Sequence, residues 1–132
     1  MKIEILDFDD LGSGLGKIDN KVCFVKNALP KEVLNVKVLK NNKNYSSAEI
    51  KNIIIPSKER IKPVCPFYNI CGGCNFLHAS FSLENAFKLQ KGEKFLGKIN
   101  NFYKTDEFNY RNKVIFHDKK GNIGLFKEKT NE

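Results

Sequence analysis

The first half of the chain alternates apolar and polar residues with the two-residue period of half-buried strands. Between residues 2 and 8 the buried positions are expected to be Ile3 and Ile5, and between residues 34 and 38 every second residue is again apolar. Residues 17–25 look like a hairpin with an Asp-Asn turn, and residues 45–55 are predicted to be a final strand that ends at Pro56. Five short strands separated by Gly, Pro and Asn predict a small closed or nearly closed β-barrel of the oligonucleotide-binding (OB) kind.

Two features inside the predicted barrel have a simple structural interpretation. The glycine-rich stretch 11–16 has the letters of a phosphate-binding loop, but it lacks the flanking Rossmann pattern, a following helix and a Gly-Lys-Ser/Thr ending. We therefore expect a bend or bulge that joins two strands. Cys23 lies in the second strand of the hairpin, where we expect a small buried hydrophobic residue.

The pattern after residue 56 predicts one helix and one hairpin. Ser80 can cap a helix over residues 81–99, whose apolar and charged residues fall on different sides. Residues 110–118 and 123–127 are expected to be two strands joined by a Lys-Lys-Gly-Asn turn. The predicted fold class is α+β and mainly β.

These elements divide the chain into three parts. The barrel is expected over residues 1–56, and a polar, proline-bounded linker over residues 57–64. Residues 65–132 are expected to begin a second domain that contains a cysteine loop, the helix and the hairpin.

Composition places the chain among soluble globular proteins. It has 132 residues, of which 41% are hydrophobic and 29% charged, and no apolar run approaches the roughly 20 residues that a membrane span needs. The N-terminus does not resemble a signal peptide. We therefore expect a cytoplasmic protein with no membrane partner, whose cysteines are reduced and available to a metal.

The net charge of +8 favours a polyanionic partner. Residues 1–64 carry twelve Lys/Arg against eight Asp/Glu, and residues 65–132 carry eleven against seven, so each part contributes +4. A basic excess spread along a chain is typical of nucleic-acid binding, although a solvated lysine-rich surface would give the same count.

Three of the four cysteines lie within ten residues, at Cys65, Cys71 and Cys74. A Cys-x-x-Cys pair can bring both sulfur atoms to one metal, and the intervening Gly72 and Gly73 allow the loop to close tightly. The spacing predicts thiolate ligation of an iron–sulfur cluster or zinc. The alternative is a turn with reduced, unligated thiols.

His78 offers a fourth ligand in a second hypothesis. Cys65, Cys71, Cys74 and His78 form a Cys-x5-Cys-x2-Cys-x3-His set, which would complete a tetrahedral zinc site in a self-contained RNA-binding module. His78 could equally be a core or surface histidine.

Cations and aromatic residues supply candidate RNA contacts. Phe24 and Tyr45 could present ring faces to unpaired bases, although either ring could belong to the barrel core. The cationic candidates could contact phosphates, or could be solvated surface residues; they are Lys17, Lys26, Lys43, Arg60, Arg111 and Lys113. No Ser/Cys–His–acid arrangement can be argued from spacing, so the chain alone is expected to be inactive as an enzyme.

Five motifs carry a resemblance to a known family: Gly12–Lys17, Phe24–Glu32, Ser57–Pro66, Cys71–Cys74 with His78, and Tyr110–Val114. Together they resemble the N-terminal part of the bacterial RNA (uracil-5-)-methyltransferases of the 23S rRNA and tRNA type, which carry a TRAM domain and an iron–sulfur cluster. The cysteine spacing joined to an upstream barrel is the specific part of this resemblance. Lys31 departs from it, because the family usually has glycine at this position.

The resemblance implies an RNA-binding TRAM barrel over residues 1–55, with ribosomal or transfer RNA as the partner. It also implies that Cys65, Cys71 and Cys74 are three of the four ligands of a 4Fe–4S cluster. The family's fourth cysteine comes later, and this chain has none after Cys74. We therefore expect an N-terminal fragment that holds the cluster poorly.

The resemblance further implies that S-adenosylmethionine binds only the full-length protein. The chain lacks the domain that binds this cofactor and carries the catalytic cysteine and general base. Its expected function is to bind structured RNA, and to supply cluster ligands, for the missing catalytic domain.

Overall fold

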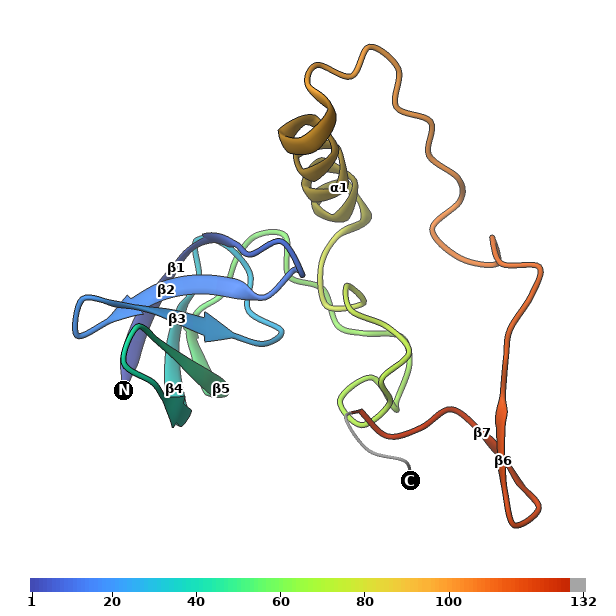
Figure 1. Cartoon of the computed structure of the whole chain (residues 1–132), viewed down its shortest axis with the longest axis horizontal. Coiled ribbons are helices and arrows are strands. Elements are labelled where there is room, and N and C mark those ends of the chain that lie inside the picture. Colours follow the sequence, from blue (N-terminus) through green and yellow to red (C-terminus); the bar gives the residue numbers. More distant parts are fainter. Residues whose placement is uncertain (129–132) are drawn as a thin grey trace.

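The computed structural model describes residues 1–128, and its first 55 residues form a closed five-stranded barrel (Figure 1). The order around the barrel is β1-β2-β3-β5-β4, and β1 pairs with β4 to close it. β3 and β5 run parallel, whereas the other neighbours are antiparallel. This architecture confirms the predicted α+β, mainly β fold with an OB-like barrel. The strands are β1 (Lys2–Phe8), β2 (Gly14–Ile18), β3 (Lys21–Val25), β4 (Val33–Asn41) and β5 (Tyr45–Ile55).

The barrel core is formed by the alternate residues of each strand. Ile3 and Ile5 of β1 are buried as predicted, and so are Leu34 and Val36 of β4. Burial of apolar area drives this packing, because neighbouring residues of a strand point to opposite faces of the sheet. Cys23 is fully buried in the same cluster, which confirms it as a small core residue.

The glycine-rich stretch differs from the prediction, because its second half is strand. Gly14 and Gly16 lie in β2, where a Cβ would stand 2.7 Å from the Ala28 Cβ and 2.5 Å from the Glu4 carbonyl oxygen, respectively. These glycines therefore allow close packing inside the barrel rather than a turn. The bend is confined to residues 9–13, where Gly12 has a φ of +86° and the Asp9 carboxylate accepts the backbone N–H of Ser13.

The helix forms largely where it was predicted. α1 spans Phe81–Leu96, and the Ser80 side chain accepts the Leu83 backbone N–H at 3.1 Å as its N-cap. The helix ends before Gly97, whose φ is +78°, and so is three residues shorter than predicted. No helix within residues 1–128 is both long and apolar enough to cross a membrane.

The C-terminal hairpin is much shorter than predicted. Its strands are β6 (His117–Lys119) and β7 (Asn122–Gly124), in place of 110–118 and 123–127. Residues 110–116 are exposed, and in the part of the chain described here β6 pairs only with β7. Strand propensity alone does not hold these residues in a sheet, because a strand needs a partner for its backbone groups.

Candidate nucleic-acid interface and cysteine loop

The outer face of the barrel carries an aromatic pair. The rings of Phe24 on β3 and Tyr45 on β5 meet edge to face, with centroids 5.8 Å apart and an interplanar angle of 83°. Tyr45 is 46% exposed and Phe24 is half-buried, so the pair lies outside the fully buried core. Exposed ring faces on a barrel wall are suited to stacking of unpaired bases.

Strand pairing aligns Lys17 with this aromatic pair. Lys17 of β2 is opposite Val22 of β3, and Val22 is opposite Tyr45 of β5. Laterally paired residues point to the same face of a sheet, so Lys17 and Tyr45 share the outer face. Lys43 lies two residues before Tyr45 in the β4–β5 turn and is exposed. The structure therefore places Lys17 on the same face as the predicted ring and Lys43 in the turn that precedes it.

Lys26 lies directly after β3 and borders a groove of about 460 Å³. Its ammonium group forms an ion pair with the Glu128 carboxylate, which comes from the end of the described chain. Phe24 lines the same groove, and Asn75 of the cysteine loop forms its far side. The groove thus lies where the barrel meets the second part of the chain.

Arg60 is used inside the protein. Its Nε and one terminal nitrogen donate to the two carboxylate oxygens of Glu32, at 2.5 and 2.8 Å, and the same terminal nitrogen donates to the Asn27 carbonyl at 2.7 Å. The Glu32 side chain is fully buried and also accepts the backbone N–H groups of Leu29 and Ser57. An RNA contact by Arg60 stays a prediction, and its observed partners join the linker to the barrel.

The pKa of Glu32 reflects two opposing effects. Burial raises it, but the hydrogen bonds from Arg60, Leu29 and Ser57 and the charge of Arg60 together outweigh burial and hold the pKa below its usual value. The carboxylate is therefore ionised at neutral pH and forms a buried, fully hydrogen-bonded ion pair with Arg60.

A second buried contact joins the cysteine loop to the barrel. The Tyr68 hydroxyl lies 2.6 Å from His78 Nδ1, 2.9 Å from the Asn75 carbonyl oxygen and 3.3 Å from Asn27 Oδ1. Burial raises the pKa of Tyr68 to about 12 and lowers that of His78 to about 4. Both side chains are therefore neutral near pH 7, and His78 is a core histidine.

The three clustered cysteines are free thiols, and Cys71 and Cys65 are close enough to Cys74 for their charges to affect its pKa. Burial raises the pKa of the Cys74 thiol, and the charges of Cys71 and Cys65 raise it further. The Gly73 backbone N–H donates to Cys71 Sγ at 3.3 Å, within the tight loop that Gly72 and Gly73 form. N–H···S bonds of this kind are common around thiolates that ligate clusters.

The described residues do not complete a metal site. Within residues 1–128 no group of three or more His, Cys, Asp or Glu side chains is arranged to hold an ion. The Cys3His arrangement with Cys65, Cys71, Cys74 and His78 is therefore not assembled here. The His78 ring instead packs against Tyr68, with ring centroids 5.7 Å apart.

Arg111 and Lys113 lie beside the cysteine loop rather than beside the barrel face. With Gly73 and Leu125 they line a cavity of about 410 Å³. The Arg111 charge acts to lower the Cys74 pKa, against the larger effect of burial. The six predicted cations therefore fall into three groups: the barrel face with its groove, the buried junction and the cysteine loop.

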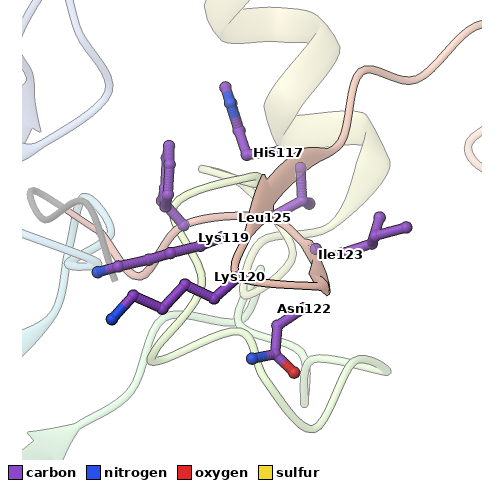
Figure 2. A pocket seen from close by; sticks show the side chains of 8 residues that line it. His117, Lys119, Lys120, Asn122, Ile123 and Leu125 are labelled. Atoms are coloured by element: carbon purple, nitrogen blue, oxygen red, sulfur yellow. The ribbon is translucent and has the colours of Figure 1, made fainter.

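The C-terminal hairpin carries a further cavity of about 360 Å³, which sequence reasoning did not identify. Figure 2 shows Lys119 and Lys120 extending to one side of it, whereas Ile123 points to the other. The rings of His117 and Phe126 stack with centroids 4.3 Å apart. The polar groups of this cavity diverge, so it does not form a convergent binding site.

Sequence reasoning missed the residues that join the two parts of the chain. Glu32, Asn27 and Tyr68 have no periodic signal, because each lies in an irregular segment. The left-handed φ of Asn27, +57°, and of Lys31, +69°, shows that this segment turns tightly. A charged residue between Lys31 and Val33 carries no sign that it is buried.

Comparisons with known proteins agree with this geometry. Residues 1–51 match the TRAM domain family. A protein of Listeria innocua named uncharacterized RNA methyltransferase is 36% identical over 100% of this chain and 32% of its own length. A 23S rRNA (uracil(1939)-C(5))-methyltransferase of Shewanella baltica is 36% identical over 67% of this chain and 20% of its own length.

A solved structure shares the fold. The Pyrococcus abyssi tRNA (uracil-54, C5)-methyltransferase, in complex with S-adenosyl-L-homocysteine, aligns with a TM-score of 0.66 and 22% identity. The alignment covers 95% of this chain and 29% of that one. This chain therefore spans about one third or less of the length of the proteins that it matches.

Proposed function

We propose that this chain, which carries a TRAM domain, binds structured RNA for a uracil-5 methyltransferase. Its similarity along its whole length to a protein named RNA methyltransferase supports this proposal. The observation that carries the proposal is the outer barrel face that Lys17 and Tyr45 share, with exposed Lys43 in the turn before Tyr45. Lysines that flank an exposed ring can bind phosphates while the ring stacks on a base. Ribosomal or transfer RNA is the proposed partner.

The salt dependence of RNA affinity tests this proposal. For single strands the slope of log affinity against log salt is roughly −0.7 for each phosphate that is neutralised. We expect a clearly negative slope with a short oligouridylate, and a shallower slope in the double variant Lys17→Gln/Lys43→Gln. Lys98→Gln changes the charge of an exposed residue after α1 and serves as the control. A flat salt plot for the unmodified chain would exclude the electrostatic mechanism.

Methyl transfer is proposed for the whole protein only. S-adenosylmethionine would supply the methyl group, and this chain's residues would bind and orient the RNA. The proposal predicts that this chain transfers no methyl group to RNA when it is incubated with S-adenosylmethionine. Methylated uracil in the products, detected by nucleoside mass spectrometry, would contradict it.

We also propose that Cys65, Cys71 and Cys74 are three ligands of a 4Fe–4S cluster. Support comes from the three neighbouring thiols and from the Gly73 N–H donated to Cys71. The fit is partial, because residues 1–128 provide no complete ligand set. When bound, the cluster would act structurally, by tying this loop to another part of the protein through metal–thiolate bonds.

Metal analysis distinguishes the cluster from zinc. Anaerobic reconstitution with iron and sulfide is expected to give absorbance at roughly 400 nm with substoichiometric iron, because a ligand is missing. Colourless, stoichiometric zinc would favour the Cys3His hypothesis, although His78 is buried against Tyr68. Stoichiometric iron and sulfide would show that three thiolates are enough.

A further inference from the structure

A groove lies between the barrel and the cysteine loop, next to the barrel face that carries Phe24 and Tyr45. Its volume is about 460 Å³, within the roughly 300–1,000 Å³ range of ligand pockets. The barrel contributes the half-buried ring of Phe24 and the ammonium group of Lys26, and the cysteine loop contributes Asn75. The β1–β2 loop closes one end through Leu11 and Ser13.

The groove shares β3 and the β1–β2 loop with the ligand-binding side of OB-like barrels. It is also lined by Leu39 of β4 and by Ser47, Ala48 and Glu49 of β5. Phe24 of β3 lies on the ligand-binding side, and its ring contacts Tyr45. The groove therefore continues the barrel face of Lys17 and Tyr45 toward the cysteine loop. A strand of RNA that follows this face reaches the groove next.

In the groove, the Lys26 ammonium group is already paired with a carboxylate, that of Glu128. The segment 126–128 packs along the cysteine loop through two backbone hydrogen bonds: the Gly72 N–H donates to the Phe126 carbonyl at 3.3 Å, and the Glu128 N–H donates to the Ile70 carbonyl at 3.0 Å. Figure 1 shows this last described stretch returning to the loop. The Glu128 carboxylate is thereby placed on the Lys26 ammonium. A carboxylate and a phosphate oxygen are both anionic acceptors for lysine.

We propose that this groove binds one unpaired nucleotide of the RNA, and that the Glu128 carboxylate competes with its phosphate for Lys26. Phe24 provides an apolar wall for the base, and Asn27 and Asn75, which also line the groove, provide hydrogen-bonding groups for its edge. The cysteine loop is then part of the RNA site rather than only a metal-binding element. This inference rests on the proposed RNA-binding function.

The competition is tested with a fluorescent decauridylate titrated against the 132-residue chain. Lys26→Gln is expected to weaken binding by about threefold to tenfold and to reduce the salt slope by roughly 0.7. Glu128→Gln is expected to strengthen binding by about twofold to fivefold, because it removes the carboxylate that competes with the phosphate for the Lys26 ammonium. Lys98→Gln and Glu4→Gln, at exposed positions, are the charge-matched controls.

A double variant separates competition at Lys26 from a general charge effect. If Glu128 acts through Lys26, the gain from Glu128→Gln disappears in the Lys26→Gln background. If Lys26→Gln and Lys98→Gln reduce RNA affinity equally while the wild-type chain still binds, the proposed nucleotide site in the groove is wrong. The proposed RNA-binding function would then still stand. A gain from Glu128→Gln that persists without Lys26 would also overturn the nucleotide site. Failure of the wild-type chain to bind would overturn both proposals.

Discussion

At the scale of single residues, the buried Glu32–Arg60 pair is the strongest polar contact between the barrel and the segment that follows it. Two nitrogen–oxygen contacts and the backbone donors of Leu29 and Ser57 satisfy the carboxylate. Such a pair is well tolerated while it is complete, but removing one charge leaves the other buried without compensation.

Glu32→Gln is therefore expected to lower the free energy of unfolding by about 3 kcal/mol, as measured by urea denaturation. Glu49→Gln is the matched control, because Glu49 pairs with Lys37 at the surface at 3.4 Å and more than half of each side chain is exposed. The control is expected to change stability by less than about 1 kcal/mol. Similar effects of the two substitutions would contradict a structural role for the buried pair.

His78 predicts a separate dependence of stability on pH. Burial lowers its pKa to about 4, from an ordinary value of 6.5. As the pH falls, His78 therefore binds a proton in the unfolded chain before it does so in the folded chain. Its contribution to the free energy of unfolding is complete above pH 6.5 and is lost as the pH falls through about 4. Between pH 6.5 and 4.5 this loss is expected to be about 2 kcal/mol.

The measurement is unfolding free energy against pH for His78→Gln, with His117→Gln as the control. His117 is exposed, so its substitution should leave the profile unchanged. The His78 variant is expected to be less stable at pH 7 and flatter between pH 6.5 and 4.5. Glu32 acts at lower pH, because its depressed pKa makes its contribution fall only below its ordinary value of 4.5. An unchanged slope in His78→Gln would show that the imidazole titrates freely.

At the scale of elements, an aromatic cluster links the barrel to α1. The rings of Phe8 of β1, Phe76 before the helix and Phe87 of α1 all contact one another, with centroid distances of 5.9, 5.1 and 5.2 Å for Phe8–Phe76, Phe76–Phe87 and Phe8–Phe87. Lys94 of the helix also pairs with Asp10 at 2.7 Å. Aromatic pairs at such distances add to the free energy gained by burial alone.

Gly12→Ala is expected to weaken this link. Its Cβ would stand 2.6 Å from the tip of the Phe76 ring, which the neighbouring rings hold, and the φ of +86° is unfavourable for alanine. Gly121→Ala is the control, because its φ is +82° and a Cβ there would meet nothing within 4 Å. Both lose about 1 kcal/mol from the backbone, and Gly12→Ala should lose roughly 1–3 kcal/mol more from crowding. Equal unfolding free energies would mean that Phe76 moves aside at little cost.

The predictability of these elements depended on where their partners lie in the sequence. The predicted strands Lys2–Phe8 and Tyr45–Ile55 are confirmed to the residue, the first from its period-two pattern and the second from the turn before it and the proline after it. Gly14 and Gly16 were mistaken for a bend, because their role is to admit Ala28 and the Glu4 carbonyl group, which is visible only in three dimensions. Residues 110–116 have strand propensity without a neighbouring strand, so propensity alone gave the wrong answer.

For the candidate site, too, what could be predicted depended on whether the interacting residues lie close together in the sequence. Local features, such as the cysteine spacing and the ring beside a lysine-containing turn, predict Cys71, Cys74 and Tyr45 as site residues, and these roles stay predictions. The partner of Arg60 could not be read from the sequence, because Glu32 is 28 residues away and nothing local marks it as buried. Arg60 therefore faces inward because it pairs with Glu32, a partner far away in the sequence.

At the scale of the whole molecule, the chain has a well-packed half and an exposed half. The barrel and the junction contain the fully buried residues, whereas no residue of α1 is buried and residues 97–116 form neither helix nor strand. Within residues 97–116, apolar side chains are exposed, among them Tyr103 at 89% and Ile115 at 68%. Stability is expected to follow burial, since local opening costs least where few apolar contacts are broken.

Limited trypsin digestion should therefore cut first between α1 and β6. Lys104, Arg111 and Lys113 are exposed and lie outside regular structure, so their backbone can enter a protease site without unfolding the barrel. Lysines of the barrel strands, such as Lys37, are equally exposed at the side chain, but their backbone is held by neighbouring strands. Mass spectrometry is expected to show fragments ending at residues 104–113 while the barrel stays intact. Cleavage after Lys37 requires the barrel to open. Early cleavage there would therefore contradict the expectation that the barrel is the more stable part.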